Sequence, residues 1–236
     1  MKISEMEVNY RYHSGNDLDV VNAARTSLDK ESEWVIEDLY TVGCWSWYRT
    51  LSDKDIKLIN YLAKHNHWTP FAHTSVTLHI RAPIFVARQA GKHQVGLVWN
   101  EVSRRYVDAE PEFWFPKEWR GRPVNIKQGS DGVVDSINFH HANPERAVGY
   151  ALDSYNAMLA AGVAPEMARM VLPQNMMTEW IWTGSLAAFA RVCKLRLDPH
   201  SQKEIQELAG AIAAIVGPLY PISWDALMKD TGEIKS

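Results

Sequence analysis

Cysteine is scarce in this sequence and follows no recognisable pattern. Cys44 and Cys193 are the two cysteines among 236 residues, and they lie far apart without CxxC spacing. Such spacing supports neither a disulfide framework nor a zinc ribbon, and it agrees with a reducing compartment. No apolar run approaches the roughly 20 residues that cross a membrane, and no basic stretch followed by an apolar run opens the chain. We therefore expect a cytoplasmic protein without a membrane partner.

Excess charge of either sign is also missing. The formal net charge is −3, from 25 basic and 28 acidic residues. Proteins that coat nucleic acid non-specifically need many cations to neutralise phosphates, so we expect no nucleic-acid polymer as a partner. Apolar residues make up 46% and charged residues 22% of the chain, as in ordinary globular proteins, which argues against disorder or a fibrous repeat. A local cationic pocket remains compatible with this balance.

Several motifs that carry common chemistries are absent. The sequence has no GxSxG, no GxxxxGK[ST] and no GxGxxG pattern. Acyl transfer by an elbow serine, P-loop chemistry and a Rossmann dinucleotide site therefore lack support. The pair His65 and His67 lacks the spacing of known metal signatures, so we expect hydrogen bonding from these histidines and no bound metal.

Strand-like and helix-like patterns interleave along the chain, which predicts one mixed α/β or α+β domain spanning residues 1–236. Strands are indicated by alternating or β-branched residues, and helices by caps and apolar stripes. We expect irregular structure over residues 29–51 and a loop from Pro111 to about Gly132. The predicted strands are 2–12, 73–83 and 176–184, and the predicted helices begin near Leu18 and Asp53 and cover 83–91, 139–162, 185–194 and 201–215.

Polar groups crowd the stretch from Asn100 to Tyr106. Glu101, Ser103 and Arg105 are two residues apart, so extended backbone would project them to one face. A guanidinium pairs bidentately with phosphate, and a neighbouring hydroxyl and carboxylate suit the sugar or base of a nucleotide. The alternative is an exposed strand face with a local ion pair, which spacing alone favours.

A second group of cations lies near the end of a predicted helix. Arg191, Lys194 and Arg196 fall within two turns, and Arg169 adds a fourth cation from another segment. These residues either form an anion site or simply complement the helix dipole, and the spacing does not decide between the two.

Five blocks of sequence, in order, carry a resemblance to a known family. They are AARTS (23–27), HNHWTPFAH (65–73), RAPIFVARQ (81–89) running into residues 92–108, ARMVLP (168–173) and LRLDPHSQKEI (195–205). The chain resembles the flavin-dependent thymidylate synthases, which methylate dUMP using methylenetetrahydrofolate, FAD and NADPH. The resemblance implies a thymidylate-synthase-complementing-protein-like fold, a mainly antiparallel sheet flanked by helices, and a homotetramer with active sites shared between subunits.

The family signature is only half intact. Asn100, Glu101, Ser103, Arg105 and Tyr106 match it, but the family's Arg-His-Arg reads Lys-His-Gln at residues 92–94. The segment between this tripeptide and the matched serine is also one residue longer than the family spacing, and we expect a bulge within 97–99 to absorb the extra residue. Lysine lacks the planar fork of arginine and glutamine lacks its charge, so contacts with the flavin are expected to be weaker or rearranged.

The resemblance implies a role for each matched residue. Arg196 is expected to contact the pyrimidine and support its activation, and Ser103 is its expected catalytic companion. Ser185 and Arg191 stand where the family has asparagines on the flavin, while Ala187 and Ala72 replace a frequent arginine and glutamate. The implied dUMP residues are Gln89, Glu101, Ser103, Arg105, Arg169 and Arg196, and the implied FAD residues are Ser27, His67, Thr69, Lys92, His93, Gln94, Glu101, Ser185 and Arg191.

The implied mechanism uses no cysteine nucleophile, and neither cysteine lies in a matched block. Reduced flavin supplies a hydride, while Arg196 stabilises charge that develops on the uracil ring. One alternative is a related flavoenzyme that hydroxymethylates dUMP or modifies dCMP, and another is a catalytically silent nucleotide-binding homologue. The expected location is the cytoplasm, or the host cytoplasm if the chain is phage-encoded.

Overall fold

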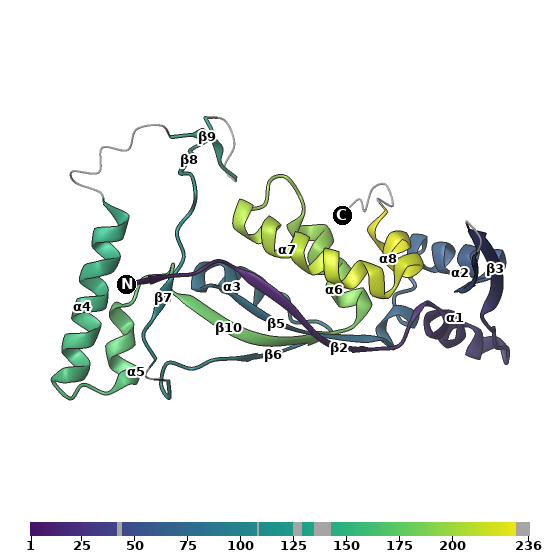
Figure 1. Ribbon diagram of the computed structural model, residues 1–236, viewed down its shortest axis with the longest axis horizontal. Helices are drawn as coiled ribbons and strands as arrows, with labels where there is room; N and C mark the ends of the chain where they lie inside the picture. The colour runs from purple at the N-terminus through teal and green to yellow at the C-terminus, as the bar shows by residue number, and fades with distance from the viewer. Residues whose placement is uncertain (42–43, 108, 125–128, 135–142, 230–236) are drawn as a thin grey trace.

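The computed structural model describes residues 1–41, 44–107, 109–124, 129–134 and 143–229. Its centre is an antiparallel sheet whose strands run in the order β2 (Glu7–Ser14), β5 (Ser75–Pro83), β10 (Met177–Gly184) and β6 (Leu97–Glu101). Helices flank the sheet, and the molecule is elongated along the strands (Figure 1). This confirms the predicted mixed α/β class with a mainly antiparallel sheet.

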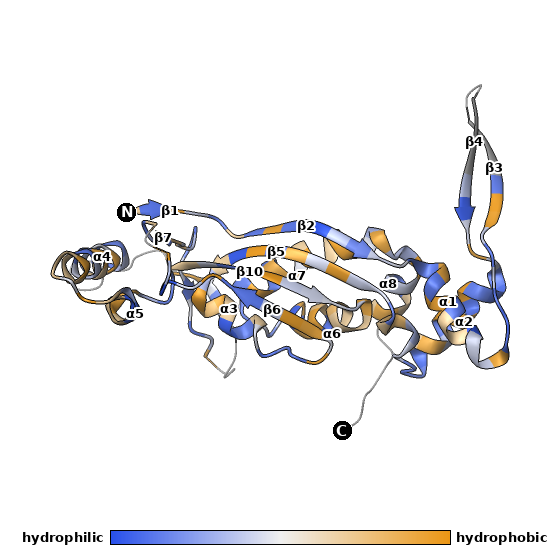
Figure 2. Ribbon diagram, turned by 90° about the horizontal axis from the view of Figure 1, so that it is seen from below, coloured by the Kyte–Doolittle hydropathy of each residue, from blue (hydrophilic) through white to orange (hydrophobic). Residues whose placement is uncertain are grey.

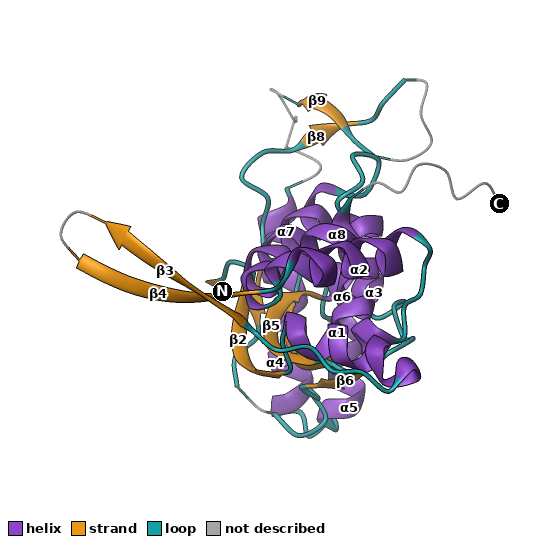
Figure 3. Cartoon of the chain, turned by 90° about the vertical axis from the view of Figure 1, so that its right-hand side faces the viewer, coloured by secondary structure: helices purple, strands orange, loops and turns teal. Residues whose placement is uncertain are grey.

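Successive side chains along each strand point to opposite faces of the sheet, one of which packs against the core while the other is open. Leu78 and Ile80 on β5 and Trp180 and Trp182 on β10 are almost fully buried. Four helices stand on the core side: α3 (Ile84–Ala90), α6 (Leu186–Arg196), α7 (Lys203–Val216) and α8 (Pro221–Met228). Figure 3 shows these helices as a layer against the strands. The predictions for α3, α6 and α7 are confirmed within a few residues, whereas α8 was missed.

Polar side chains cap the N-termini of the two helices at one end of the molecule. Helix α1 (Asp17–Arg25) begins after Asn16, whose side chain accepts from the N–H groups of Leu18 and Asp19, and α2 (Asp53–Lys64) begins after the cap Ser52. Short 3-10 turns follow α1 at Thr26–Leu28, precede β5 at Pro70–Ala72 and join α7 to α8 at Gly217–Leu219. Both predicted caps are confirmed.

One buried carboxylate joins the start of α1 to the start of α8. The Asp17 side chain is 3% exposed and accepts hydrogen bonds from the backbone N–H groups of Ile222 at 3.1 Å and Ser223 at 2.8 Å. A carboxylate at a helix N-terminus satisfies N–H groups that have no partner within the helix. This long-range contact accounts for a helix that local pattern did not reveal.

The opposite end of the molecule holds a smaller cluster of apolar side chains. Helix α4 (Pro144–Ala160) packs Val148, Leu152 and Tyr155 against Phe113 and Met176. Helix α5 (Pro165–Ala168) and a 3-10 turn (Arg169–Val171) follow it. The predicted helix over 139–162 is confirmed from residue 144, and residues 139–142 lie outside the described part of the chain. None of the helices in the described ranges is long and apolar enough to span a bilayer.

Two predictions of irregular structure were wrong in part. The range 29–51 contains an antiparallel hairpin of β3 (Val35–Thr41) and β4 (Cys44–Thr50), which projects away from the helices in Figure 2. Its described residues at 35–37 and 48–49 are all exposed, so these positions do not show the alternation of buried and exposed side chains that identifies a strand. Residues 42–43 and 125–128 lie outside the described part.

The predicted loop from Pro111 to Gly132 also contains short strands. They are β7 (Glu112–Phe113), β8 (Arg120–Gly121) and β9 (Asp131–Val133), and β7 pairs in parallel with β1 (Lys2–Ile3). The strand predicted over 2–12 is therefore divided into β1 and β2. Strands of two or three residues are too short to leave a periodic pattern in a sequence.

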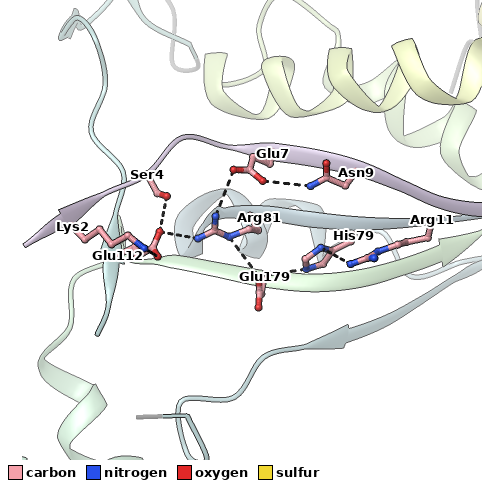
Figure 4. A network of polar contacts seen from close by, with 9 residues as sticks. All are labelled: Lys2, Ser4, Glu7, Asn9, Arg11, His79, Arg81, Glu112 and Glu179. Carbon is pink, nitrogen blue, oxygen red and sulfur yellow. Dashed lines mark hydrogen bonds and ion pairs between the residues drawn. The ribbon is translucent and has the colours of Figure 1, made fainter. Parts of the chain in front are cut away.

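An ion-pair network on the open face joins β1, β2, β5, β7 and β10 (Figure 4). Arg81 lies 2.8 Å from Glu112, 3.6 Å from Glu7 and 3.5 Å from Glu179. Glu112 also accepts hydrogen bonds from Lys2 and from Ser4. Hydrogen bonds from Lys2, Ser4 and Arg81, with the charge of Arg81, lower the pKa of Glu112 from 4.5 to about 2.

Glu112→Gln is expected to lower thermal stability in a way that depends on pH. Because the folded pKa of Glu112 is depressed, its stabilising contribution is complete above pH 4.5 and is lost as pH falls towards 2. The gap in unfolding midpoint between wild type and variant should therefore be widest near neutrality and shrink below pH 4.5, as followed by circular dichroism. Glu207→Gln on the exposed surface of α7 is the control, and a gap for Glu112→Gln that stays constant with pH would contradict the assignment.

Candidate functional site

The loop between α3 and β6 is fixed against the first half of α6. The backbone N–H of Ser185 donates to the Gly96 carbonyl at 3.3 Å, and Arg191 donates to the Val95 carbonyl at 2.5 Å. Gly96 has a φ of 74°, and a Cβ on it would lie 3.2 Å from the Cβ of Ala188. A left-handed turn packed this closely favours glycine. Residues 91–96 are thus held by a helix that lies about 90 positions later in the sequence.

Arg196, in the last turn of α6, reaches into the same loop. Its Nε donates to Nε2 of His93 at 2.9 Å, and its Nη2 donates to the Gln89 carbonyl at 3.3 Å. Both side chains are half-buried. Because a guanidinium only donates, Nε2 of His93 must accept, so this imidazole is neutral and carries its proton on Nδ1.

The surroundings of His93 favour that neutral form. Burial lowers the pKa of His93, and the positive charges of Arg196 and then Arg191 lower it further. Burial also lowers the pKa of Arg196 from its very high ordinary value. The pair therefore keeps a single positive charge, on the guanidinium of Arg196.

Glu101 is held at the end of β6 above a layer of indole rings. One of its carboxylate oxygens accepts from the Thr178 hydroxyl at 2.6 Å, and the other accepts from Nε1 of Trp99 at 3.2 Å. The Trp99 ring stacks on Trp180 with 4.2 Å between centroids. Two donors and a rigid aromatic support fix the orientation of this carboxylate.

The predicted extended backbone over residues 101–105 is wrong. Strand β6 ends at Glu101, and residues 104–106 form a turn in which the Tyr106 N–H donates to the Ser103 carbonyl at 3.0 Å. The Ser103 hydroxyl accepts from Nε of Arg105 at 3.3 Å, so hydroxyl and guanidinium do converge, through the turn. The predicted bulge over 97–99 is also wrong, because β6 pairs with β10 there without a shift of register.

Many of the predicted residues line three separate hollows. The loop hollow, of about 460 Å³, is lined by Lys92, His93, Gln94 and Glu101 together with Leu97 and Trp99. The Arg196 hollow, of about 610 Å³, is lined by Gln89 and Arg196 together with Asp198, His200 and Gln202. The α1–α2 hollow, of about 310 Å³, is lined by Ser27, His67 and Thr69.

The residues of the Lys-His-Gln tripeptide differ in exposure. Lys92 and Gln94 are exposed, whereas His93 between them is half-buried and bonded to Arg196. The two substitutions within the tripeptide therefore fall on positions that face solvent in this chain. The position that keeps the family residue is the one that packs.

The remaining predicted residues are placed differently. Ser185 caps α6, with its hydroxyl accepting from the Ala188 N–H at 3.3 Å. Arg169 is exposed and donates to the Glu166 carbonyl at 3.2 Å, in the turn that follows α5. In Figure 1, α5 lies at one end of the molecule and α1, which precedes Ser27, at the other. One copy of the chain thus brings only part of the predicted set together.

Sequence reasoning missed Gln202 as a site residue. Gln202 lines the Arg196 hollow and its Oε1 accepts from Nε2 of Gln89 at 2.5 Å. The available signal was its position within the matched block LRLDPHSQKEI, in which only the arginine was singled out.

Comparisons with known proteins show the family of the chain. Residues 10–222 match the thymidylate synthase complementing protein family. The chain is 37% identical over 215 residues to the flavin-dependent thymidylate synthase of Thermus thermophilus, covering 90% of this chain and 72% of that protein. It belongs to this family. The flavin-dependent thymidylate synthase of Thermotoga neapolitana is 35% identical, covering 91% of this chain and 87% of that protein.

Solved structures place the fold in the same family. The UMP/dUMP methylase PolB from Streptomyces cacaoi bound with 5-Br dUMP has a TM-score of 0.77 at 28% identity, with 96% of each chain covered. The same methylase bound with 5-Br UMP has a TM-score of 0.75 at 28% identity, with 96% of this chain and 95% of that chain covered. The recognition of a flavin-dependent thymidylate synthase from sequence blocks is therefore confirmed.

Arg196→Met is expected to raise the pKa of His93 in this family member. The variant removes a positive charge and a donor that requires the neutral imidazole, while burial still holds the pKa below 6.5. In wild type the folded chain binds this proton less readily than the unfolded chain, so stability falls as pH drops below 6.5. NMR titration of the His93 ring measures the shift.

Lys194→Met is the matched control, because it removes an exposed cation from the same helix without a contact to His93. A His93 pKa that is unchanged in Arg196→Met, or equally raised in both variants, would contradict the pairing.

Proposed function

We propose that this chain catalyses the reductive methylation of dUMP to dTMP, with FAD as cofactor, methylenetetrahydrofolate as carbon donor and NADPH as reductant. Family membership sets the reaction class, and one observation on this chain carries the proposal. That observation is the guanidinium of Arg196, held between neutral His93 and the Gln89 carbonyl at the edge of a hollow. A cation fixed in advance of the reaction stabilises charge that develops on a bound ring.

The residues present fit a flavin at two of the three places considered. The loop hollow combines apolar walls at Leu97 and Trp99 with the polar groups of Lys92 and His93, as a flat, partly polar ring system requires. The α1–α2 hollow offers Ser27 and His67 to the polar remainder of the cofactor. The fit is poorer at Ser185 and Arg191, because the first caps α6 and the second binds the Val95 carbonyl.

The chain's own groups then orient and stabilise the nucleotide. Bound FAD, once reduced, supplies the hydride that converts the transferred carbon unit to a methyl group. Ser103 and Arg105, brought together by the turn after β6, present a hydroxyl and a guanidinium to the phosphate. Glu101, with both oxygens already bonded, holds a fixed negative group between the nucleotide and the flavin. Arg196 faces the pyrimidine.

We also propose that residues 1–236 act as one domain in a homotetramer whose sites combine residues of different copies, in the cytoplasm of the cell or of a phage host. The support is the spread of the predicted set along one copy. Ser27 lies at the α1 end and Arg169 at the α5 end, so a single copy cannot gather them into one site (Figure 1). Symmetric association brings opposite ends of a chain together.

Methylation of UMP is a second candidate activity. Both solved structures compared above are of an enzyme named a UMP/dUMP methylase, and one holds 5-Br dUMP while the other holds 5-Br UMP. The two nucleotides differ only at the 2′-hydroxyl, so discrimination depends on contacts with the sugar.

Turnover of dUMP with FAD, NADPH and methylenetetrahydrofolate tests the proposed reaction. We expect dTMP as the product, and a loss of about 100-fold or more in kcat for Arg196→Ala, because a preorganised charge is removed. Lys194→Ala on the same helix should retain activity. Parallel assays with UMP and dCMP distinguish the alternatives. Failure to bind flavin, or a product other than dTMP from dUMP, would refute the proposal.

Mixing two inactive variants tests whether sites are shared between copies. If Arg169 and Arg196 of one site come from different chains, co-expressed Arg169→Ala and Arg196→Ala chains form some sites with both arginines intact. Random assembly would restore about a quarter of wild-type activity. Each variant purified alone should stay inactive, and a mixture that is equally inactive would show that both arginines of a site belong to one chain.

A further inference from the structure

A chain of hydrogen bonds leads from the interior to Gln89. Nη2 of Arg120 donates to Oε1 of Glu204 at 2.5 Å, and Nε2 of Gln202 donates to Oε2 of the same carboxylate at 2.8 Å. Gln202 in turn accepts at Oε1 from Nε2 of Gln89, as given above. The four connected side chains come from β8, from α7 and the residue before it, and from α3, and the last of them lines the Arg196 hollow.

Glu204 is the buried end of this chain and stays ionised. Its side chain is 5% exposed, and burial alone would raise its pKa. The hydrogen bonds from Arg120, its own backbone N–H and Gln202, together with the charge of Arg120, outweigh burial and lower the pKa of Glu204. An ionised carboxylate is restricted to accepting hydrogen bonds.

Because Glu204 can only accept, it fixes the orientation of the side-chain amides of Gln202 and Gln89 in turn. Because Glu204 only accepts, Gln202 must turn its NH₂ group towards it, which leaves the Gln202 carbonyl oxygen facing Gln89. Gln89 must then turn its own NH₂ group towards Gln202. Its Oε1 is left free to accept, with no hydrogen bond to it among the described residues.

We propose that Gln202 and Glu204 are positioning residues that orient the amide of Gln89, so that Gln89 presents a hydrogen-bond acceptor to an N–H or O–H donor of the nucleotide. This inference rests on the proposed function, which places Gln89 at dUMP. Neither positioning residue needs to touch the substrate. The role follows from the sequence of donors and acceptors along the chain of contacts.

The polarity of this chain can be reversed and restored without a change in side-chain size. In Glu204→Gln, Arg120 still donates to an oxygen at position 204, so the new NH₂ group faces Gln202. Gln202 then turns its oxygen towards position 204 and its NH₂ group towards Gln89, which leaves Gln89 offering N–H to the nucleotide. When Gln202→Glu is added, the carboxylate at position 202 accepts from the NH₂ group at position 204 and from the NH₂ group of Gln89. Gln89 therefore returns to its original orientation.

We therefore expect a loss and a rescue in dUMP recognition by the FAD-loaded protein. Glu204→Gln should raise the KM and the dissociation constant for dUMP about five- to tenfold with little change in kcat, the effect of one misdirected hydrogen bond. The double variant Gln202→Glu/Glu204→Gln should return both constants to within about threefold of wild type. Glu207→Gln on the exposed side of α7 removes the same charge and should change neither constant.

A purely structural role would not produce the rescue, so a double variant as weak as Glu204→Gln would overturn the proposal. A second measurement stands independently of activity. Gln89→Met and Gln202→Met should be strongly non-additive in thermal unfolding, since each removes the same hydrogen bond, and additive effects would also overturn the proposal. If the wild-type protein neither binds nor turns over dUMP, the proposed function is refuted. The double-mutant cycle of Gln89→Met and Gln202→Met would still show whether Gln202 is hydrogen-bonded to Gln89.

Discussion

The position of β10 in the middle of the sheet is the constraint on which the rest of the structure depends. It pairs with β5 over eight residues and with β6 over five, so its register determines which side chains of both neighbours face the helices. Glu101 lies opposite Trp180 and therefore faces the core side, above the indole layer. The last residue of β10 leads directly into α6. A slip of one residue would turn Glu101 to the open face and detach α6 from the loop that it holds.

Helix α6 then acts on the loop before β6 through four contacts along its length. Ser185 donates to the Gly96 carbonyl at the start of the helix, Arg191 to Val95 in the middle, and Arg196 to His93 and to the Gln89 carbonyl at the end. Three of these four hydrogen bonds come from the two arginines, and hydrogen bonds from charged groups contribute about 1.5–3 kcal/mol each. The cations near the helix end were ambiguous in the sequence between an anion site and a helix dipole. In the structure Arg191 and Arg196 bind backbone carbonyls and an imidazole, which orders the loop.

Local sequence features predicted much of the fold, but they do not reveal contacts between residues that are distant in the sequence. The caps Asn16 and Ser52 and the apolar stripe of α4 are local features, and the elements they predict were found. Helix α8 depends on Asp17, which lies 205 positions before Ile222 and outside any window of sequence. The turn after Glu101 uses local bonds among residues 103–106, and a two-residue spacing of polar groups does not distinguish such a turn from a strand. The blocks that identify the family named Lys92, His93, Gln94 and Glu101 in the loop hollow and Gln89 and Arg196 in the Arg196 hollow. Gln202 was not predicted as a site residue because it acts through its hydrogen bond to Gln89, and the residue type alone does not indicate that contact.

Neighbouring positions in the tripeptide at residues 92–94 differ in how strongly a substitution would affect folding. His93 is held by packing and by Arg196, so a change there would be felt by the folded state itself. Lys92 and Gln94 are exposed, and exchanges at such positions have small effects on folding. Substitutions at these two positions should therefore leave the stability of the fold nearly unchanged, and falling below a stability threshold is what removes most mutations. The surface that this loop presents to solvent can therefore change at residues 92 and 94 while the bond between His93 and Arg196 keeps the loop in place.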